Sequence, residues 1–140
     1  MMHLHEEVQT TVCIAPVNLA TASVIGSAID RKGYGGVEFL VSFGTIAAST
    51  TTVAATVMES DSSTASTFTS VADADLIGTE ALASIGLAAR VAGSTSAVTK
   101  KIGYKGTKRY VKVKLKANVS STGGATAVLF NPAVRPIAQA

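Results

Sequence analysis

Residues 109–117, RYVKVKLKA, alternate strictly between apolar and polar side chains. A period of two is the geometry of a β-strand, in which successive side chains point to opposite faces. The sequence therefore predicts a strand that is buried on one face. That face carries Arg109, Val111, Val113, Leu115 and Ala117. The opposite face carries Lys108, Tyr110, Lys112, Lys114 and Lys116.

This lysine face has two interpretations. Like charges side by side on a sheet repel one another, so the face either stays in water or meets an acidic surface. It is then a solvated face whose lysines protect a sheet edge, or a docking surface for an acidic partner. A basic strand face also suits single-stranded nucleic acid, but only Tyr110 and Tyr104 could stack on bases. Nucleic-acid binding is therefore not expected.

The rest of the chain also has the pattern of short strands. In residues 37–43, Val37, Phe39, Val41 and Phe43 share one face, which predicts a strand at the centre of a sheet. Further strands are predicted at 11–15, 53–59, 68–71, 98–104 and 125–130. Their spacing predicts an all-β protein, an antiparallel β-sandwich or jelly roll of about eight strands. The crossover helices of a parallel α/β fold are not visible.

Several boundaries follow from glycine and proline. Pro16 is predicted to end the first strand, and residues 120–124, SSTGG, to form a turn in which Gly123 and Gly124 take positive φ. Residues 73–90 are either a covering loop or a short helix, because Gly78 and Gly86 interrupt the helical pattern. A strand is expected near Leu87–Val91.

The chain is predicted to hold one domain. Residues 11–130 form the sandwich, since 140 residues suffice for a single core. Residues 1–10 and 131–140 have no clear period, and Pro132 and Pro136 break the second segment. They are expected to be an extended N-terminal arm and a C-terminal tail.

Charge is divided unequally along the sequence. Residues 1–80 hold nine acidic and two basic residues, 2 − 9 = −7, whereas residues 81–140 hold ten basic residues and no acidic one, +10. Such a chain is suited to pairing between subunits, or to contact between its basic half and an acidic surface.

No set of residues for catalysis is recognisable. The only histidines, His3 and His5, form an H-x-H pair that could chelate a metal, but no further ligand lies nearby, so exposed arm histidines are expected. Cys13 stands alone in an apolar setting and is expected to be a buried, inert thiol. The sequence thus predicts no enzyme, no metal site and no cofactor. It also lacks the pattern of a signal peptide or a membrane span, so the protein is expected to stay in the cytosol until assembly.

Three segments carry a resemblance to a known group: AIDRKGYGGVEFLVSFG, MESDSSTASTFTSVADADLIG and KIGYKGTKRYVKVKL. They resemble small structural proteins of tailed bacteriophages and prophages, over most of residues 17–130. The resemblance implies a jelly-roll decoration (cement) protein on the outside of the capsid, assembled in the host cytoplasm. Its partners would be the major capsid protein and further copies of itself, as a homotrimer in preference to a homodimer. The alternatives are a head–tail connector or tail component and, in another class, a carbohydrate- or nucleic-acid-binding β module.

The residues expected to contact partners come from the two chain ends and the lysine face. They are Met1, His3, His5, Glu6, Glu7, Lys108, Tyr110, Lys112, Lys114, Lys116 and Arg135.

Overall fold

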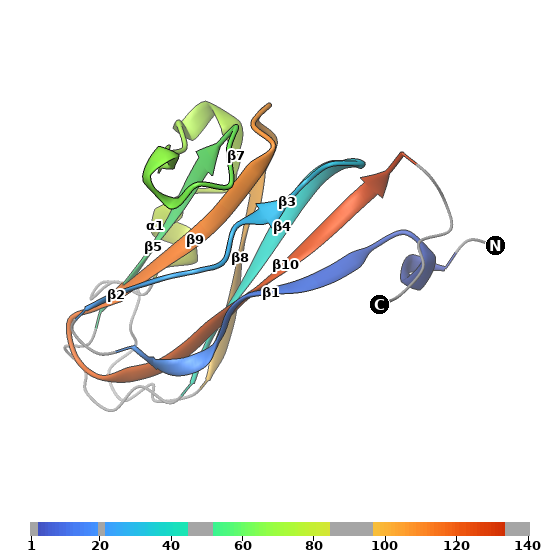
Figure 1. The fold of residues 1–140 in the computed structure, drawn as a ribbon. Helices are drawn as coiled ribbons and strands as arrows, with labels where there is room; N and C mark the ends of the chain where they lie inside the picture. The colour runs from blue at the N-terminus through green and yellow to red at the C-terminus, as the bar shows by residue number, and fades with distance from the viewer. Residues whose placement is uncertain (1–2, 20–21, 45–51, 85–96, 134–140) are drawn as a thin grey trace.

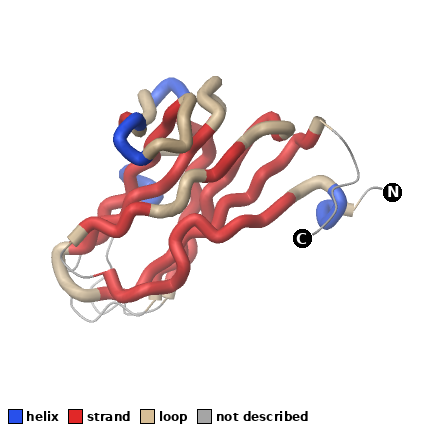
Figure 2. The backbone as a smooth tube through the Cα atoms, viewed as in Figure 1, coloured by secondary structure: helices blue, strands red, loops and turns tan. Residues whose placement is uncertain are grey.

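The computed structural model describes residues 3–19, 22–44, 52–84 and 97–133. Two antiparallel sheets pack face to face (Figures 1 and 2), so the predicted all-β sandwich is confirmed. Sheet A has the order β1 (Gln9–Leu19), β10 (Ser121–Pro132), β4 (Tyr34–Phe43), β8 (Val98–Tyr104) and β7 (Leu76–Ile77). Sheet B has the order β2 (Ser23–Ile25), β9 (Tyr110–Ala117), β5 (Val53–Ser60) and β6 (Thr69–Ser70), and β3 (Ile29–Asp30) also pairs with β9. The short helices are η1 (Leu4–Glu6), η2 (Ala65–Thr67), η3 (Asp73–Asp75) and α1 (Glu80–Ala83).

The core lies between β4 and β9, as their alternation predicts. β4 is the middle strand of sheet A, and Val37, Phe39, Val41 and Phe43 are all buried. From sheet B, the apolar side chains of residues 111–117 are fully buried against them. The outer face of β4 is more open than its inner face, since Leu40 is 36% exposed.

The first strand is longer than predicted. β1 begins at Gln9, inside the expected arm, and continues through Pro16 to Leu19. Pro16 is tolerated because β1 is an edge strand with two register shifts, between Val12 and Ile14 and between Ile14 and Val17. Before β1, part of the expected arm forms the 3-10 turn η1.

The predicted SSTGG turn is wrong, because Gly123 and Gly124 lie within β10. Here glycine permits a close approach of two strands. A Cβ atom on Gly124 would lie 2.9 Å from the carbonyl oxygen of Ile14 and 3.1 Å from the nitrogen of Pro16. The absence of a side chain at Gly124 therefore leaves the space that the irregular part of β1 occupies.

Contacts at both sides join the two sheets. On one side the single helical turn α1 contacts both β5 and β8. Of the ambiguous residues 73–90, the structure describes 73–84, which hold η3, β7 and α1. The strand expected near Leu87–Val91 lies outside the described residues. On the other side, the amide of Ser27 donates to the Cys13 carbonyl at 2.8 Å. The Cys13 side chain is buried as predicted, and burial raises the pKa of its thiol.

Candidate partner-binding surface

The predicted lysine face is the outer face of sheet B, at strand β9. β9 is an interior strand, with β5 on one side and β2 and β3 on the other. The interpretation that its lysines protect a sheet edge is therefore wrong. The turn before β9 also crosses from sheet A to sheet B, because β8 and β9 belong to different sheets.

Lys112 is not available to a partner. Its side chain is only 6% exposed, and its ammonium group lies 3.9 Å from the centre of the Phe68 ring. Phe68 follows η2, in the connection that leads from β5 to β6. This contact is a cation–π interaction that covers the middle of the lysine face.

Lys108 is paired within the chain. It forms a salt bridge with Asp61, and the hydrogen bond to that carboxylate raises the pKa of Lys108. The backbone amide of Lys108 donates to the Tyr104 hydroxyl at 3.0 Å. That hydroxyl in turn donates to Glu59. Burial is the larger cause that raises the pKa of Tyr104, and the hydrogen bond to Glu59 raises it further.

Tyr110 is half-buried and lies beside a paired arginine. The Arg109 guanidinium lies 5.0 Å from the centre of the Tyr110 ring. Arg109 also donates two hydrogen bonds to Asp30, at 2.9 and 2.7 Å. Its side chain is exposed and does not enter the core as the alternation predicted. The bond to Arg109 lowers the pKa of Asp30 to about 2.

The divided charge of the sequence is thus partly matched inside the fold. Asp30 and Asp61 come from the acidic half, and their partners Arg109 and Lys108 come from the basic half. The Arg31 guanidinium also links the two halves of the sequence, since it donates a hydrogen bond to the Gly106 carbonyl at 2.8 Å. Part of the divided charge is therefore paired within the chain.

Two lysines of the face keep their charge at the surface. Lys116 is exposed and Lys114 half-buried, and neither forms a salt bridge within the described residues. Their cross-strand neighbours are uncharged, and one of them, Ile25, is 56% exposed. The Lys114–Lys116 patch, as we call it, consists of Ser23, Ile25, Ala54, Thr56, Lys114 and Lys116.

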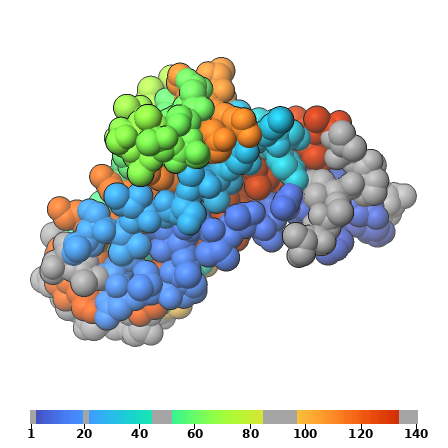
Figure 3. Space-filling view, in the orientation of Figure 1, coloured from blue at the N-terminus to red at the C-terminus, as the bar shows by residue number. Residues whose placement is uncertain are grey.

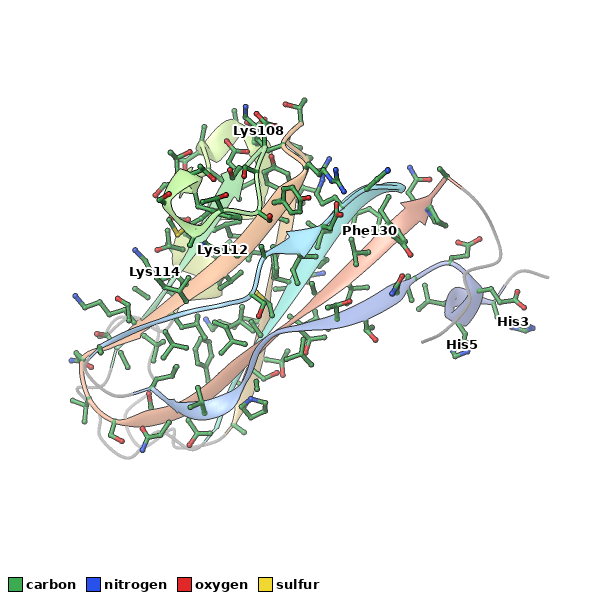
Figure 4. All side chains as sticks on the ribbon, in the orientation of Figure 1. His3, His5, Lys108, Lys112, Lys114 and Phe130 are labelled. Carbon is green, nitrogen blue, oxygen red and sulfur yellow. The ribbon has the colours of Figure 1, made fainter. Side chains whose placement is uncertain are left out.

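The candidate residues of the arm lie elsewhere. Figure 4 shows His3 and His5 at one end of the molecule and Lys108, Lys112 and Lys114 toward the other. Both histidines are exposed around η1, whereas Glu6 and Glu7 are half-buried. The structure therefore does not bring the two predicted contact regions together, and Met1 and Arg135 lie outside the described residues.

The described residues contain no cluster of three or more potential metal-ligating side chains. No helix in this part of the chain has the length and apolarity that a membrane crossing needs.

Sequence reasoning missed Phe68 and Ile25 as parts of this surface. Phe68 was expected only as part of a strand at 68–71. A large apolar residue after a serine-rich turn is a signal for a covering contact, but nothing local shows that its partner is Lys112. The pairing of β2 with β9 has no local signal either.

Comparison with known proteins gives matches in structure only. No protein-family description and no curated protein sequence matches the chain. The PBSX exported protein XepA aligns with 94% of this chain at a TM-score of 0.53 and 12% identity, but the chain spans only 39% of that protein's length. The capsid structure of Helicobacter pylori bacteriophage KHP30 gives a TM-score of 0.49 at 18% identity, covering 90% of each chain. A Bacillus endospore appendage protein gives 0.41 at 8% identity, covering 90% of this chain and 89% of the other. At these identities, the similarity to XepA shows that the sandwich fold is shared.

Proposed function

We propose that this chain is a non-enzymatic structural protein of a tailed phage or prophage virion. More specifically, it decorates the capsid by binding the outside of the assembled major-capsid lattice. The resemblance of three segments to phage structural proteins supports the class, and the sandwich fold agrees with it. The observation that carries the specific proposal is the Lys114–Lys116 patch, because it is the part of the lysine face with no salt bridge to the described residues.

The patch suits attachment to an acidic protein surface. It combines two cations with the exposed side chain of Ile25 on a sheet face. Exposed charges are screened beyond about 8 Å at physiological salt, so only acidic groups that come close to Lys114 and Lys116 would contribute. Charge would then raise the association rate, and apolar contact would add to the affinity.

Stabilisation of the capsid would follow from mass action. A protein that binds only the assembled lattice lowers the free energy of that lattice by RT ln(1 + [L]/Kd) for each site. Attachment of an oligomer at several sites, such as the homotrimer that the resemblance implies, would strengthen the binding further.

The test is co-sedimentation of the purified chain with capsids of the phage whose genome encodes it. We expect the parent to bind, and the double variant Lys114→Gln/Lys116→Gln to bind more weakly and with less dependence on salt. The matched control is Lys32→Gln/Lys105→Gln, which removes the same charge from two exposed loop residues. It should bind like the parent.

Two outcomes would contradict the proposal at different levels. Equal binding by the parent and the Lys114/Lys116 variant would remove the patch from the interface. Failure of the parent to bind capsids, together with its recovery from tails, would favour a connector or tail component.

A further inference from the structure

The edges of both sheets differ in how well they are protected. In the described part of the chain, the edge strands β2, β3, β6 and β7 have only two or three residues each. Short edge strands offer little backbone to a foreign strand. Where β6 does not cover β5, the amides of Ala55 and Val57 donate to Ser84 Oγ and Glu80 Oε1, at 2.9 and 2.7 Å.

Strand β1 is the exception, because it is an edge strand of eleven residues. Its second half is interrupted by the two register shifts, and such irregularities hinder pairing. Its first half, Gln9–Val12, is regular and lies opposite Thr126–Leu129 of β10 without a shift. Residues 9–15 contain neither a charge nor a proline, the usual protection of an open edge.

Residues 10–12 of this first half are exposed on both faces of the strand. Thr10, Thr11 and Val12 are consecutive exposed residues, and Val12 is 57% exposed. The space-filling view in Figure 3 shows blue atoms of the N-terminal segment along the surface of the molecule.

The hydrogen-bond pattern shows which backbone groups face the open edge. The amide of Gly44 donates to the carbonyl of Thr122, in register with the pairing of β4 and β10. In an interior strand, the backbone N–H and C=O groups of successive residues point alternately to the two neighbouring strands. The backbone groups of even-numbered residues of β10 therefore point to β4, and those of odd-numbered residues point to β1. Gln9 and Thr11 lie opposite Leu129 and Ala127 and face β10. The backbone groups of Thr10 and Val12 therefore point to the open edge.

We propose that this segment pairs with the same segment of a second copy, antiparallel and about a two-fold axis at Thr11. Thr10 of each copy then lies opposite Val12 of the other. Each of these two equivalent pairs exchanges two backbone hydrogen bonds, which makes four in all. Thr11 faces Thr11, and no like charges meet within the segment. The two five-stranded A sheets become one continuous sheet.

A second copy is the occupant that these observations favour. Pairing requires a partner with an open, uncharged edge strand, and every copy of this chain carries one in a self-complementary register. The assembly is a homodimer, in contrast to the homotrimer that the resemblance implies. It needs no capsid, so its test is independent of the proposed function.

The first test is sedimentation of the full chain over a wide range of protein concentrations. The parent should pass from 14.2 kDa to twice that mass as the concentration rises. Val12→Lys, which places a charge at the paired edge, should weaken dimerisation by about tenfold or more. The matched control is Val17→Lys, at a 41% exposed site of the same strand beyond the shifts, which should dimerise like the parent. A parent that stays monomeric, or a Val12→Lys variant that dimerises normally, would overturn the proposal.

The second test is cross-linking under mild oxidation. Directly opposed residues of a non-hydrogen-bonded pair have Cα atoms about 4.5 Å apart, a separation that a disulfide can span. Thr11→Cys should therefore form a covalent dimer faster than Thr10→Cys, which tests the register, and faster than Thr107→Cys in an exposed loop. The native Cys13 is buried and should contribute little. Equal rates for the three variants would refute the pairing, and the fastest reaction at Thr10 would refute its register.

Discussion

At the scale of single residues, Lys112 shows how one contact changes the meaning of a sequence pattern. A buried cation is costly unless it has a partner, and the Phe68 ring supplies one at 3.9 Å. The alternation around Lys112 correctly indicates its face of the sheet. It carries no information about a covering segment, because that segment comes from a distant part of the chain.

Phe39 offers a direct test of the core at this scale. Its ring is fully buried, so Phe39→Ala should lower the free energy of unfolding by about 3–5 kcal/mol, through lost burial and a residual cavity. Leu40→Ala is the matched control, since this neighbour points to the other face and is 36% exposed. Denaturant unfolding should show a much smaller loss for Leu40→Ala. Equal losses would mean that the assigned face is wrong.

The Asp30–Arg109 pair predicts a dependence of stability on pH. Arg109 lowers the pKa of Asp30 from 3.8 to about 2, so the pair stabilises the fold fully above the ordinary pKa. That contribution is lost as the pH falls from about 4 to about 2. Because both side chains are exposed, solvent screens the pair and its contribution to stability should be small.

The measurement compares the parent with Asp30→Asn in denaturant unfolding. The parent should be the more stable protein near neutral pH, and the difference should vanish only below about pH 2, once Asp30 is protonated in the folded state as well. A difference that persisted in acid would assign the effect to the shape of the side chain and not to its charge.

At the scale of elements, α1 matters mainly through the two acceptors that it brings to β5. Glu80 Oε1 accepts from the Val57 amide at 2.7 Å, and Ser84 Oγ, at the end of the helical turn, accepts from the Ala55 amide at 2.9 Å. This edge would otherwise present unpaired backbone donors.

Removing the acceptor should therefore open the edge. Glu80→Ala should cost about 1–3 kcal/mol of unfolding free energy and speed hydrogen exchange at the Val57 amide. Glu80→Gln keeps an acceptor oxygen at the same position and should exchange nearly as slowly as the parent. Fast exchange in both variants would show that the charge of Glu80 is needed, and slow exchange in both would show that the bond is dispensable.

The sequence predicted individual strands better than it predicted their neighbours. Residues 37–43 were expected as a strand and lie within β4, because burial of every second side chain leaves a local period. The position of β9 inside its sheet depends on pairing with distant strands, so no local pattern revealed it. The same holds for Gly124, whose role depends on the backbone of Ile14 and Pro16. Of the lysine face, Lys114 and Lys116 reach the surface, whereas Lys108 and Lys112 have partners within the chain.

At the scale of the whole molecule, the fold distributes charge more evenly than the sequence does. Acidic residues of the first half pair with basic residues of the second half, at Asp30–Arg109 and Asp61–Lys108. Two surfaces of the described residues are our candidates for partners: the Lys114–Lys116 patch on sheet B and the open edge of β1 on sheet A. These two surfaces belong to different sheets, so a pair of copies joined through β1 would keep both patches available for a capsid.

The most direct test of the central claim is cryo-electron microscopy of the phage that encodes this chain, with its gene intact and with it deleted. The proposed function predicts a difference density on the outer surface of the head, of a size that fits copies of a 14.2 kDa sandwich, and heads that are less stable without it. A difference density confined to the tail or the connector, or identical virions from both phages, would contradict it.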